Sequence, residues 1–282
     1  MKKKAPFSVF GLAAAVLLTL GVSLNAACVF IGEDGSFFGR DYKYKQEMLK
    51  TYPLAADGSF TLKNTNGLIR ISSWERAEVE IKAEKATARE NDLDRIEIKI
   101  DANDKAVSVD TIYPKLRFFR ARVNYEVNVP AGSRLETIRS TNGDVELTGR
   151  FGDVKAGSTN GDVRLDGASG KISLSTTNGD IQAQNITGRL EADTTNGKIT
   201  LEVPKLEADI DAGTTNGSIH LRLGADPNAR LSAHTTNGHV TVDFPITVQG
   251  RISSRRRVEG TIGNGGPAIS LKTTNGSITI GR

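Results

Sequence analysis

The most regular feature of the chain is a strict alternation of apolar and polar residues after each of eight Thr-Asn-Gly motifs. The second residue after the glycine is β-branched in every copy: Ile69, Val145, Val163, Ile181, Ile199, Ile219, Val240 and Ile278. The fourth is apolar in every copy: Ile71, Leu147, Leu165, Ala183, Leu201, Leu221, Val242 and Ile280. Since successive side chains of a strand point to opposite faces, each segment is predicted to be a β-strand with one buried face.

The residues before each asparagine alternate in the same way. Apolar residues lie six and four positions upstream, as Ile172 and Leu174 do before Asn178, and in seven copies a Ser or Thr lies two positions upstream. On this period the asparagine itself falls on the inward side. A repeat is therefore predicted to be a strand, an Asn-Gly corner, a second strand and a looser turn such as residues 167–170.

The spacing of the motifs predicts the architecture. The asparagines are Asn66, Asn142, Asn160, Asn178, Asn196, Asn216, Asn237 and Asn275, with steps of 76, 18, 18, 18, 20, 21 and 38 residues. Such a period is typical of supersecondary units that stack to bury a shared core. We therefore predict an all-β fold, a single-stranded parallel β-solenoid (β-helix) of 18–21-residue Thr-Asn-Gly rungs. The rival architecture is a β-sandwich of hairpins, because Asn-Gly is also a strong hairpin signal.

Stacked rungs would bring identical side chains into register at a spacing of about 4.8 Å. The eight asparagines are then expected to form an amide ladder at the corners, and the upstream Ser and Thr residues a hydroxyl ladder. Each corner glycine is expected to supply a positive φ. Seven of these glycines follow the asparagines from Asn142 onward: Gly143, Gly161, Gly179, Gly197, Gly217, Gly238 and Gly276.

One stretch inside the repeat array departs from the pattern. Residues 246–263 fill the step of 38 and are predicted to form a degenerate rung, in which Arg255, Arg256 and Arg257 replace the corner motif. With Arg251 nearby, these arginines form a candidate patch for an anionic partner. The alternative is a solvated turn.

The part before the array is less regular. Residues 41–130 contain the first repeat and several irregularly connected alternating strands, with a short helical turn near Glu90 to Asp94. We predict that they form an N-terminal β layer that caps the solenoid repeat domain of residues 131–282, because an open end would expose unpaired backbone.

The N-terminus has the pattern of an export signal. Three lysines at positions 2–4 precede an apolar stretch, residues 7–24, which ends in small and polar residues before Cys28. Residues 1–27 are predicted to be a signal peptide. A transmembrane helix is the competing interpretation, because the apolar run approaches spanning length.

Cys28 is the only cysteine, so an intramolecular disulfide is excluded. Its position makes it the candidate lipid attachment site of a lipoprotein, and an incidental residue near an ordinary signal-peptidase site is the alternative. Residues 28–40 are then a polar tether. The mature protein is expected in the periplasm or outer cell envelope, held at a membrane through the lipid anchor.

Charge argues against a nucleic-acid partner. The chain has 37 Lys and Arg against 33 Asp and Glu, and three of the lysines belong to the predicted signal peptide. The mature protein is therefore nearly neutral and lacks the basic footprint of a nucleic-acid binder.

An enzyme is the competing functional class, because parallel β-helices also carry polysaccharide-cleaving sites built from carboxylates or metals. Asp144, Asp162 and Asp180 directly follow the corner glycine in three successive rungs, where a cation such as Ca²⁺ would relieve their repulsion. The column ends at Lys198, and solvated carboxylates beside Arg164 are the favoured alternative. The three histidines lie at different phases and are expected at the surface. We expect no catalytic residues, no metal and no cofactor.

Four segments add to this picture: residues 63–71 followed by Trp74, the entry to the array at 127–132, the Thr-Asn-Gly-Asp-Val series, and residues 262–266 before the last repeat. Together they resemble the DUF4097 family, over roughly residues 55–280. The resemblance implies a toast-rack-like β-repeat domain on exported or membrane-attached bacterial proteins that are regarded as adhesins by conjecture, with no catalytic residues to transfer.

These observations favour a non-enzymatic interaction or structural protein of the cell envelope, an adhesin or scaffold that presents a rigid β-repeat surface. Its expected partner is an envelope or cell-surface component, either a glycan or a protein. A polysaccharide-active β-helix enzyme and an envelope-stress sensing module are the alternatives.

Overall fold

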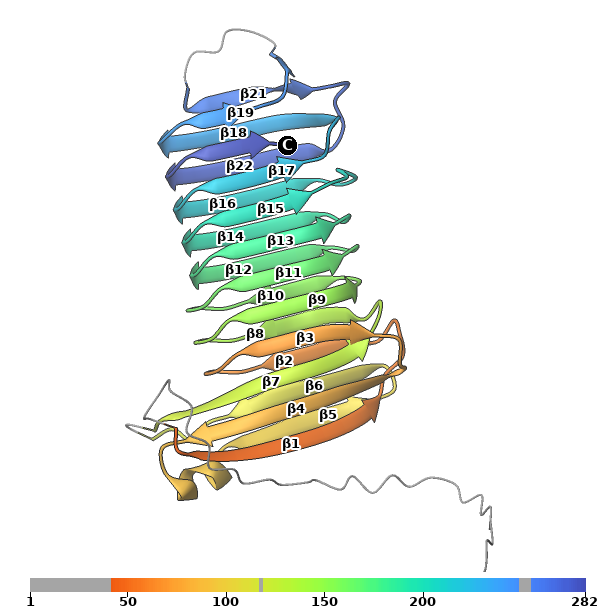
Figure 1. Cartoon of the computed structure of the whole chain (residues 1–282), viewed down its shortest axis with the longest axis vertical. Helices are drawn as coiled ribbons and strands as arrows, with labels where there is room; N and C mark the ends of the chain where they lie inside the picture. The colour runs from red at the N-terminus through yellow and green to blue at the C-terminus, as the bar shows by residue number, and fades with distance from the viewer. Residues whose placement is uncertain (1–41, 117–118, 249–254) are drawn as a thin grey trace, which may run out of the picture.

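The computed structural model describes residues 42–116, 119–248 and 255–282, which form two long β-sheets stacked face to face (Figure 1). Within these ranges the regular elements are strands, apart from one short 3-10 helix, η1 (Glu90–Arg95). The all-β prediction is confirmed, and the helical turn expected near Glu90 is η1. No helix in these ranges is long and apolar enough to cross a membrane. The predicted signal peptide and tether lie outside the described residues.

Sheet A contains the strands that follow the corners. In spatial order its 11 strands are β1 (Tyr44–Pro53), β4 (Glu78–Thr87), β7 (Ala121–Pro130), β3 (Ile69–Trp74), β9 (Val145–Phe151), β11 (Val163–Ala168), β13 (Ile181–Ile186), β15 (Ile199–Val203), β17 (Ile219–Leu223), β23 (Ile278–Gly281) and β19 (Val240–Val242).

Sheet B contains the strands that precede the corners. In spatial order its 12 strands are β20 (Ile246–Thr247), β21 (Arg257–Ile262), β18 (Ala229–Asn237), β22 (Ala268–Asn275), β16 (Ile210–Asn216), β14 (Leu190–Asn196), β12 (Ile172–Asn178), β10 (Val154–Gly157), β8 (Arg134–Arg139), β2 (Ser59–Lys63), β6 (Ala106–Ile112) and β5 (Glu97–Asn103).

Successive repeats pair in parallel, residue for residue. In sheet A, Ile181 lies beside Val163 on one side and Ile199 on the other. In sheet B, Leu190 is paired with Ile172 in the same way. The two strands that flank each Asn-Gly belong to different sheets. The hairpin sandwich is therefore wrong, because a hairpin would place both strands side by side in one sheet.

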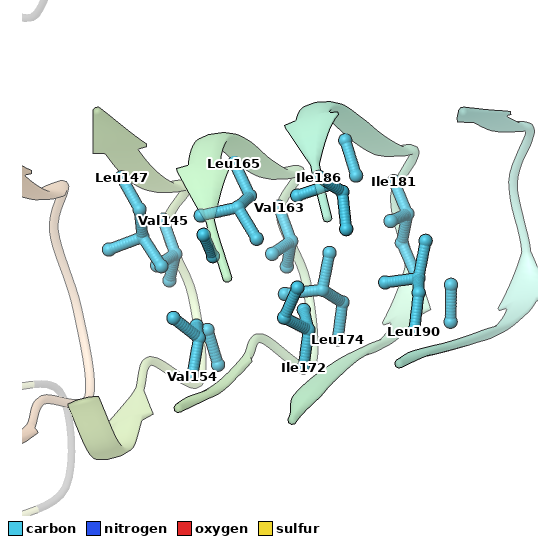
Figure 2. Packing of buried hydrophobic residues seen from close by; sticks show 14 of the residues in the cluster. Val145, Leu147, Val154, Val163, Leu165, Ile172, Leu174, Ile181, Ile186 and Leu190 are labelled. Atoms are coloured by element: carbon cyan, nitrogen blue, oxygen red, sulfur yellow. The ribbon is translucent and has the colours of Figure 1, made fainter. Parts of the chain in front are cut away.

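The core is a set of apolar columns between the sheets. Figure 2 shows Val145, Val163 and Ile181 of sheet A facing Ile172 and Leu190 of sheet B, and each is at most 1% exposed. Burying apolar surface contributes about 25 cal/mol per Å². Because each repeat covers its neighbour's apolar edge, the stacking itself creates the core.

At the C-terminal end, the order of repeats in space differs from their order in the chain. The last repeat, β22 and β23, lies between β16–β17 and β18–β19 (Figure 1). The chain passes from β17 to the outermost repeat, β18–β19, and returns to the inner position.

The degenerate rung predicted for residues 246–263 is therefore wrong. β21 pairs with β18 in the antiparallel direction, with Ile262 opposite Ala229, and so covers the outer edge instead of continuing the parallel stack. Val258 and Ile262, whose alternation fits a rung, lie in this covering strand, where Ile262 is 2% exposed. Arg257 begins β21 and does not form a corner.

At the N-terminal end the first repeat, β2 and β3, lies directly beside β8 and β9. Sheet A continues outward through β7 and the antiparallel strands β4 and β1, and sheet B through β6 and β5. Tyr125 in β7 is fully buried, and its hydroxyl lies 2.6 Å from Thr111 Oγ1 in β6. The outer strands β1, β4 and β7 of sheet A and β5 and β6 of sheet B thus cover the first repeat.

The corner glycines are required by close backbone approach. A Cβ added at Gly179 would collide with the carbonyl oxygen of Gly161. The same collision with the carbonyl oxygen of the neighbouring corner glycine occurs at Gly143, Gly161, Gly197, Gly217, Gly276 and Gly238. The expected positive φ is present at Gly67, Gly143, Gly161 and Gly276, between 121° and 158°, but not at Gly179, Gly197, Gly217 or Gly238. The expectation is therefore confirmed at four corners and wrong at the other four, where close approach alone requires glycine.

Replacing Gly179 with alanine is expected to lower the free energy of unfolding by about 1–3 kcal/mol, the usual cost of forcing extra volume into a packed site. The check is the urea midpoint followed by far-UV circular dichroism. Thr177→Ala, on the exposed side of the same corner, is the control, with an expected change within about 0.5 kcal/mol. Equal midpoints for the two variants would contradict the close-approach argument.

Candidate functional site

A continuous chain of side-chain amides runs along the corners. In every member but the first, Asn66, the Nδ2 donates to the Oδ1 of the neighbouring asparagine, and all seven bonds measure 2.8 Å. In spatial order the members are Asn66, Asn142, Asn160, Asn178, Asn196, Asn216, Asn275 and Asn237. We call this set the asparagine column.

The asparagine column lies at the surface. From Asn142 onward its members are exposed, so the expectation that these side chains point inward is wrong. The backbone turns at the asparagine, and the alternation that holds along the strand ends there. The column is therefore available to solvent along its length.

The inward Ser and Thr residues donate to backbone rather than to one another. Thr176 Oγ1 donates to the carbonyl oxygen of Gly161 at 2.9 Å, and Thr194 Oγ1 to that of Gly179 at 3.0 Å. The equivalent bonds involve Ser140, Ser158, Thr214, Thr273 and Thr235. The predicted hydroxyl ladder is wrong, because each of these hydroxyls donates to the corner carbonyl of the adjacent repeat instead.

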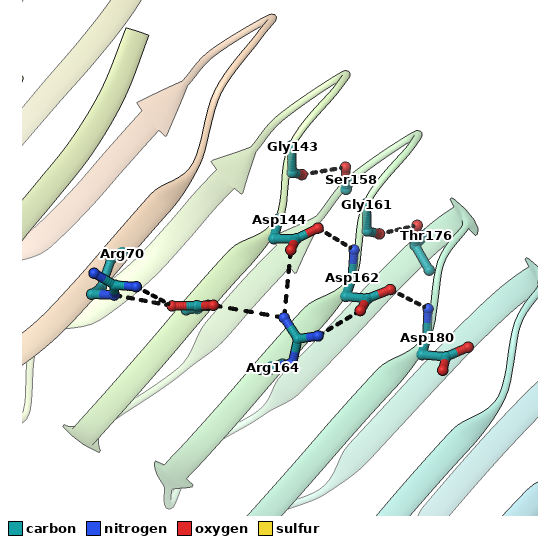
Figure 3. A network of polar contacts seen from close by, with 10 residues as sticks. Arg70, Gly143, Asp144, Ser158, Gly161, Asp162, Arg164, Thr176 and Asp180 are labelled. Carbon is teal, nitrogen blue, oxygen red and sulfur yellow. Dashed lines mark hydrogen bonds and ion pairs between the residues drawn. The ribbon is translucent and has the colours of Figure 1, made fainter. Parts of the chain in front are cut away.

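The three aspartates after the corners are held by protein groups: Figure 3 shows the contacts of the Asp144 and Asp162 carboxylates, and Asp180 Oδ1 accepts the backbone N–H of Lys198 at 2.8 Å. Asp144 Oδ1 accepts the backbone N–H of Asp162 at 2.9 Å, and Asp162 Oδ1 accepts that of Asp180 at 2.8 Å. Arg164 lies 2.6 Å from Asp162 and 3.5 Å from Asp144. Among the described residues no group of three or more acidic, His or Cys side chains has metal-binding geometry.

The outer face of sheet A carries a polar groove of about 350 Å³ next to this network. Glu146, Arg164, Gln182, Gln184 and Glu202 line it. Glu146 also contacts Arg70 at 2.9 Å, which extends the network to the first repeat. The groove therefore presents fixed charges and amides along successive strands.

A larger open pocket, of about 620 Å³, lies at the Asn66 end of the asparagine column. Its lining includes Tyr42, Asn66, Phe119, Arg120, Arg122, Asn124, Asn142, Asp144 and Glu146. We call it the end pocket. The guanidinium carbon of Arg122 lies 4.8 Å from the centre of the Tyr42 ring.

Arg122, which lines the end pocket, has one donor atom that is unpartnered among the described residues. Its Nε is buried and has no hydrogen-bond partner in the part of the chain that the structure describes. Sequence reasoning missed this residue, because Arg122 occupies an ordinary polar position of an alternating strand. Nothing in the sequence places it against Tyr42.

The remaining candidate residues lie apart from the end pocket. Arg257 pairs with Glu259 at 2.6 Å. The carbonyl groups of Arg255 and Arg256 accept the backbone N–H groups of Val240 and Thr235, while their side chains are exposed. Arg251 and Cys28 lie outside the described residues.

His220 and Asp193 are among the titratable groups of the array with shifted pKa values. Burial lowers the pKa of His220, and Lys198 lowers it further. On sheet B, burial raises the pKa of Asp193, with further contributions from Glu191 and Asp211. His239 contacts Ser277 at 3.0 Å, but no carboxylate in the described ranges completes a triad with them.

The chain is similar to known proteins over most of its length. The family model described as Toastrack DUF4097 matches residues 37–281. A candidate cell adhesion protein from Clostridium sporogenes ATCC 15579 is 15% identical, with 84% of this chain and 99% of that chain covered and a TM-score of 0.37. A candidate adhesin from Bacteroides fragilis NCTC 9343 is 15% identical, with 83% and 96% covered and a TM-score of 0.36.

A third solved structure is a candidate lipid-binding protein from Parabacteroides distasonis ATCC 8503. It is 11% identical, with 83% of this chain and 96% of that chain covered and a TM-score of 0.42. No curated protein matches the chain. The match of the family model spans both sheets.

Thr194→Val is expected to lower the free energy of unfolding by about 1 kcal/mol, because it removes the hydroxyl that donates to the Gly179 carbonyl and keeps the shape. Thr195→Val is the matched control, since Thr195 is the exposed neighbour in the same strand. Thermal unfolding followed by circular dichroism measures both. A loss in Thr195→Val equal to that in Thr194→Val would show that the bond to the corner carbonyl contributes nothing.

Proposed function

This chain belongs to the Toastrack DUF4097 family, and on that premise we propose that it is a non-enzymatic interaction protein of the bacterial cell envelope. It acts as an adhesin or envelope scaffold through the outer surface of its stacked repeats. We propose the finer fold assignment with it: a parallel β-solenoid of 18–21-residue Thr-Asn-Gly rungs, capped at the N-terminal end by residues 41–130.

The observation that carries the proposal is the end pocket. It combines an aromatic ring, Tyr42, with the guanidinium of Arg122 and the amides of Asn66 and Asn142. Aromatic faces pack against sugar rings, and a guanidinium binds carboxylate. We therefore propose an acidic glycan of the envelope or cell surface as the partner.

The carboxylates around the end pocket support binding over catalysis. Asp144 accepts a backbone N–H and lies beside Arg164, and Glu146 contacts Arg70. Groups held in this way fix the shape of the rim and the orientation of Arg164. A pair of carboxylates free to work as acid and base, which a polysaccharide-active enzyme needs, would have to lie elsewhere.

Location is part of the proposal. Residues 1–27 act as a signal peptide and Cys28 carries the lipid that holds the mature chain at a membrane. The support is the order of three lysines, an apolar stretch and Cys28 in the sequence. Arg251, Arg255, Arg256 and Arg257 stay a second candidate surface for anionic headgroups or acidic polysaccharide.

Binding of acidic glycan is tested by calorimetry of the purified mature chain with oligouronates and with the same oligosaccharides after carboxyl reduction. We expect binding of the carboxylated series alone, and Arg122→Gln to weaken it about tenfold, which corresponds to 1.4 kcal/mol. Arg230→Gln is the control, since Arg230 is an exposed arginine of β18 in sheet B.

Two outcomes contradict the end pocket as the binding site. One is binding that Arg122→Gln leaves unchanged. The other is loss of binding in the double variant of Arg255 and Arg256, which would assign the glycan to the arginine patch. Absence of binding to every carboxylated probe would reject the glycan as partner and favour a protein.

The anchor has its own test. Metabolic labelling with a fatty-acid analogue is expected to mark the wild-type protein and leave Cys28→Ala unlabelled, with the variant released from the membrane fraction. A labelled Cys28→Ala protein would place the lipid elsewhere. An unlabelled, unanchored wild type would reject the lipoprotein proposal.

A further inference from the structure

Asn-Gly is the dipeptide in which asparagine most readily cyclises and loses ammonia, because glycine leaves its own backbone nitrogen unshielded. The eight members of the asparagine column all have this sequence, so all eight would be labile in an unfolded chain. We propose that folding protects seven of them and leaves Asn237 as a site of spontaneous conversion to aspartate and isoaspartate.

Cyclisation requires the glycine nitrogen to lose its proton and reach the side-chain Cγ of the asparagine. Inside the column neither partner is free to do so. The N–H of Gly179 donates to the carbonyl oxygen of Asn196 at 3.0 Å. The amide of Asn178 donates to Asn160 and accepts from Asn196, both at 2.8 Å.

The same backbone bond recurs at the other inner corners. The glycine N–H donates to the backbone carbonyl oxygen of the asparagine in the next repeat, at 2.9–3.1 Å. This bond is made by Gly67, Gly143, Gly161, Gly197, Gly217 and Gly276. At the first end of the column, Asn66 is also held on both sides, because its amide donates to Ala121 and accepts from Asn142. Stacking therefore protects each of these asparagines with two or three hydrogen bonds.

Asn237 is the outermost member and lacks this protection. Its Nδ2 donates to Asn275 at 2.8 Å, but in the described ranges its Oδ1 accepts no bond and the N–H of Gly238 donates none. Gly238 is exposed, whereas the other seven corner glycines are half-buried. Among the described residues, the Asn237 side chain is thus held by one hydrogen bond, where the inner members of the column have two.

The identity of the labile residue follows from the spatial order of the repeats. If the repeats were stacked in chain order, Asn275 would be the open end. Because β22–β23 lies inside β18–β19, Asn275 is an inner member, and the N–H of Gly276 donates to the Asn237 carbonyl at 3.0 Å. The prediction for Asn237 therefore distinguishes the observed topology from sequential stacking.

The reaction is balanced with water as the only co-reactant. The Gly238 nitrogen gives its proton to a solvent base and attacks Cγ of Asn237, so that a new C–N bond forms. The bond from Cγ to Nδ2 then breaks, and Nδ2 leaves as ammonia after protonation, which gives a succinimide. Water opens either imide carbonyl, and the products are aspartate or isoaspartate with one new carboxylate.

The test is incubation of the folded mature protein at mildly alkaline pH, followed by trypsin digestion and electron-transfer mass spectrometry, which separates aspartate from isoaspartate. Asn237, Asn178 and Asn275 lie in different tryptic peptides. We expect Asn237 to convert at least about tenfold faster than the other two. A parallel sample in concentrated urea should show similar rates at all three.

Three outcomes overturn the proposal. Equal rates at the column asparagines in the folded protein would show that stacking gives no protection. A faster reaction at Asn275 would support stacking in chain order. His239→Gln addresses local base catalysis by the following residue: a fall of the Asn237 rate to that of Asn178 would assign the lability to His239 and not to the missing hydrogen bonds.

Discussion

The backbones of neighbouring repeats meet more closely at the Asn-Gly corner than any side chain on the glycine would permit, and the rest of the structure depends on this approach. The glycine N–H reaches the asparagine carbonyl of the next repeat, and the glycine carbonyl receives the inward hydroxyl. As a result, both strands leave the corner in register with those of the next repeat, and this register aligns the apolar columns of the two sheets.

The features that recur in every repeat could be predicted from the sequence, but individual hydrogen-bond partners and the exposure of the corner side chains could not. Alternation around Asn178, together with the 18-residue step, was sufficient for the strands, the corner and the burial of Ile172 and Ile181. It could not show that Thr194 bonds a carbonyl instead of another hydroxyl, because periodicity fixes the direction of a side chain and not its partner. The exposure of the asparagines was missed for a related reason, since strand alternation does not continue through a turn.

The order of the last repeats in space could not be predicted from the sequence either. The motifs around Asn237 and Asn275 are nearly identical, so nothing local determines which of them is outermost, and the antiparallel pairing of Ile262 with Ala229 involves residues that fit a rung equally well. The end pocket could not be predicted either, because it depends on contacts between segments that are distant in the chain. Tyr42 and Arg122 meet because β1 and β7 both pair with β4, a contact between distant segments that no motif encodes.

The internal placement of the last repeat also affects how the molecule can assemble. A solenoid stacked in chain order can grow vectorially, with each repeat docking on the one made before it. Here Asn275 pairs with Asn216 across 59 residues, so the stack beyond β17 closes only after the final strands have been synthesised. Closing such a long loop is slow. Until then the backbone edges of β16 and β17 and the apolar side chains beside them have no partner from the last repeat, and surfaces of this kind favour aggregation.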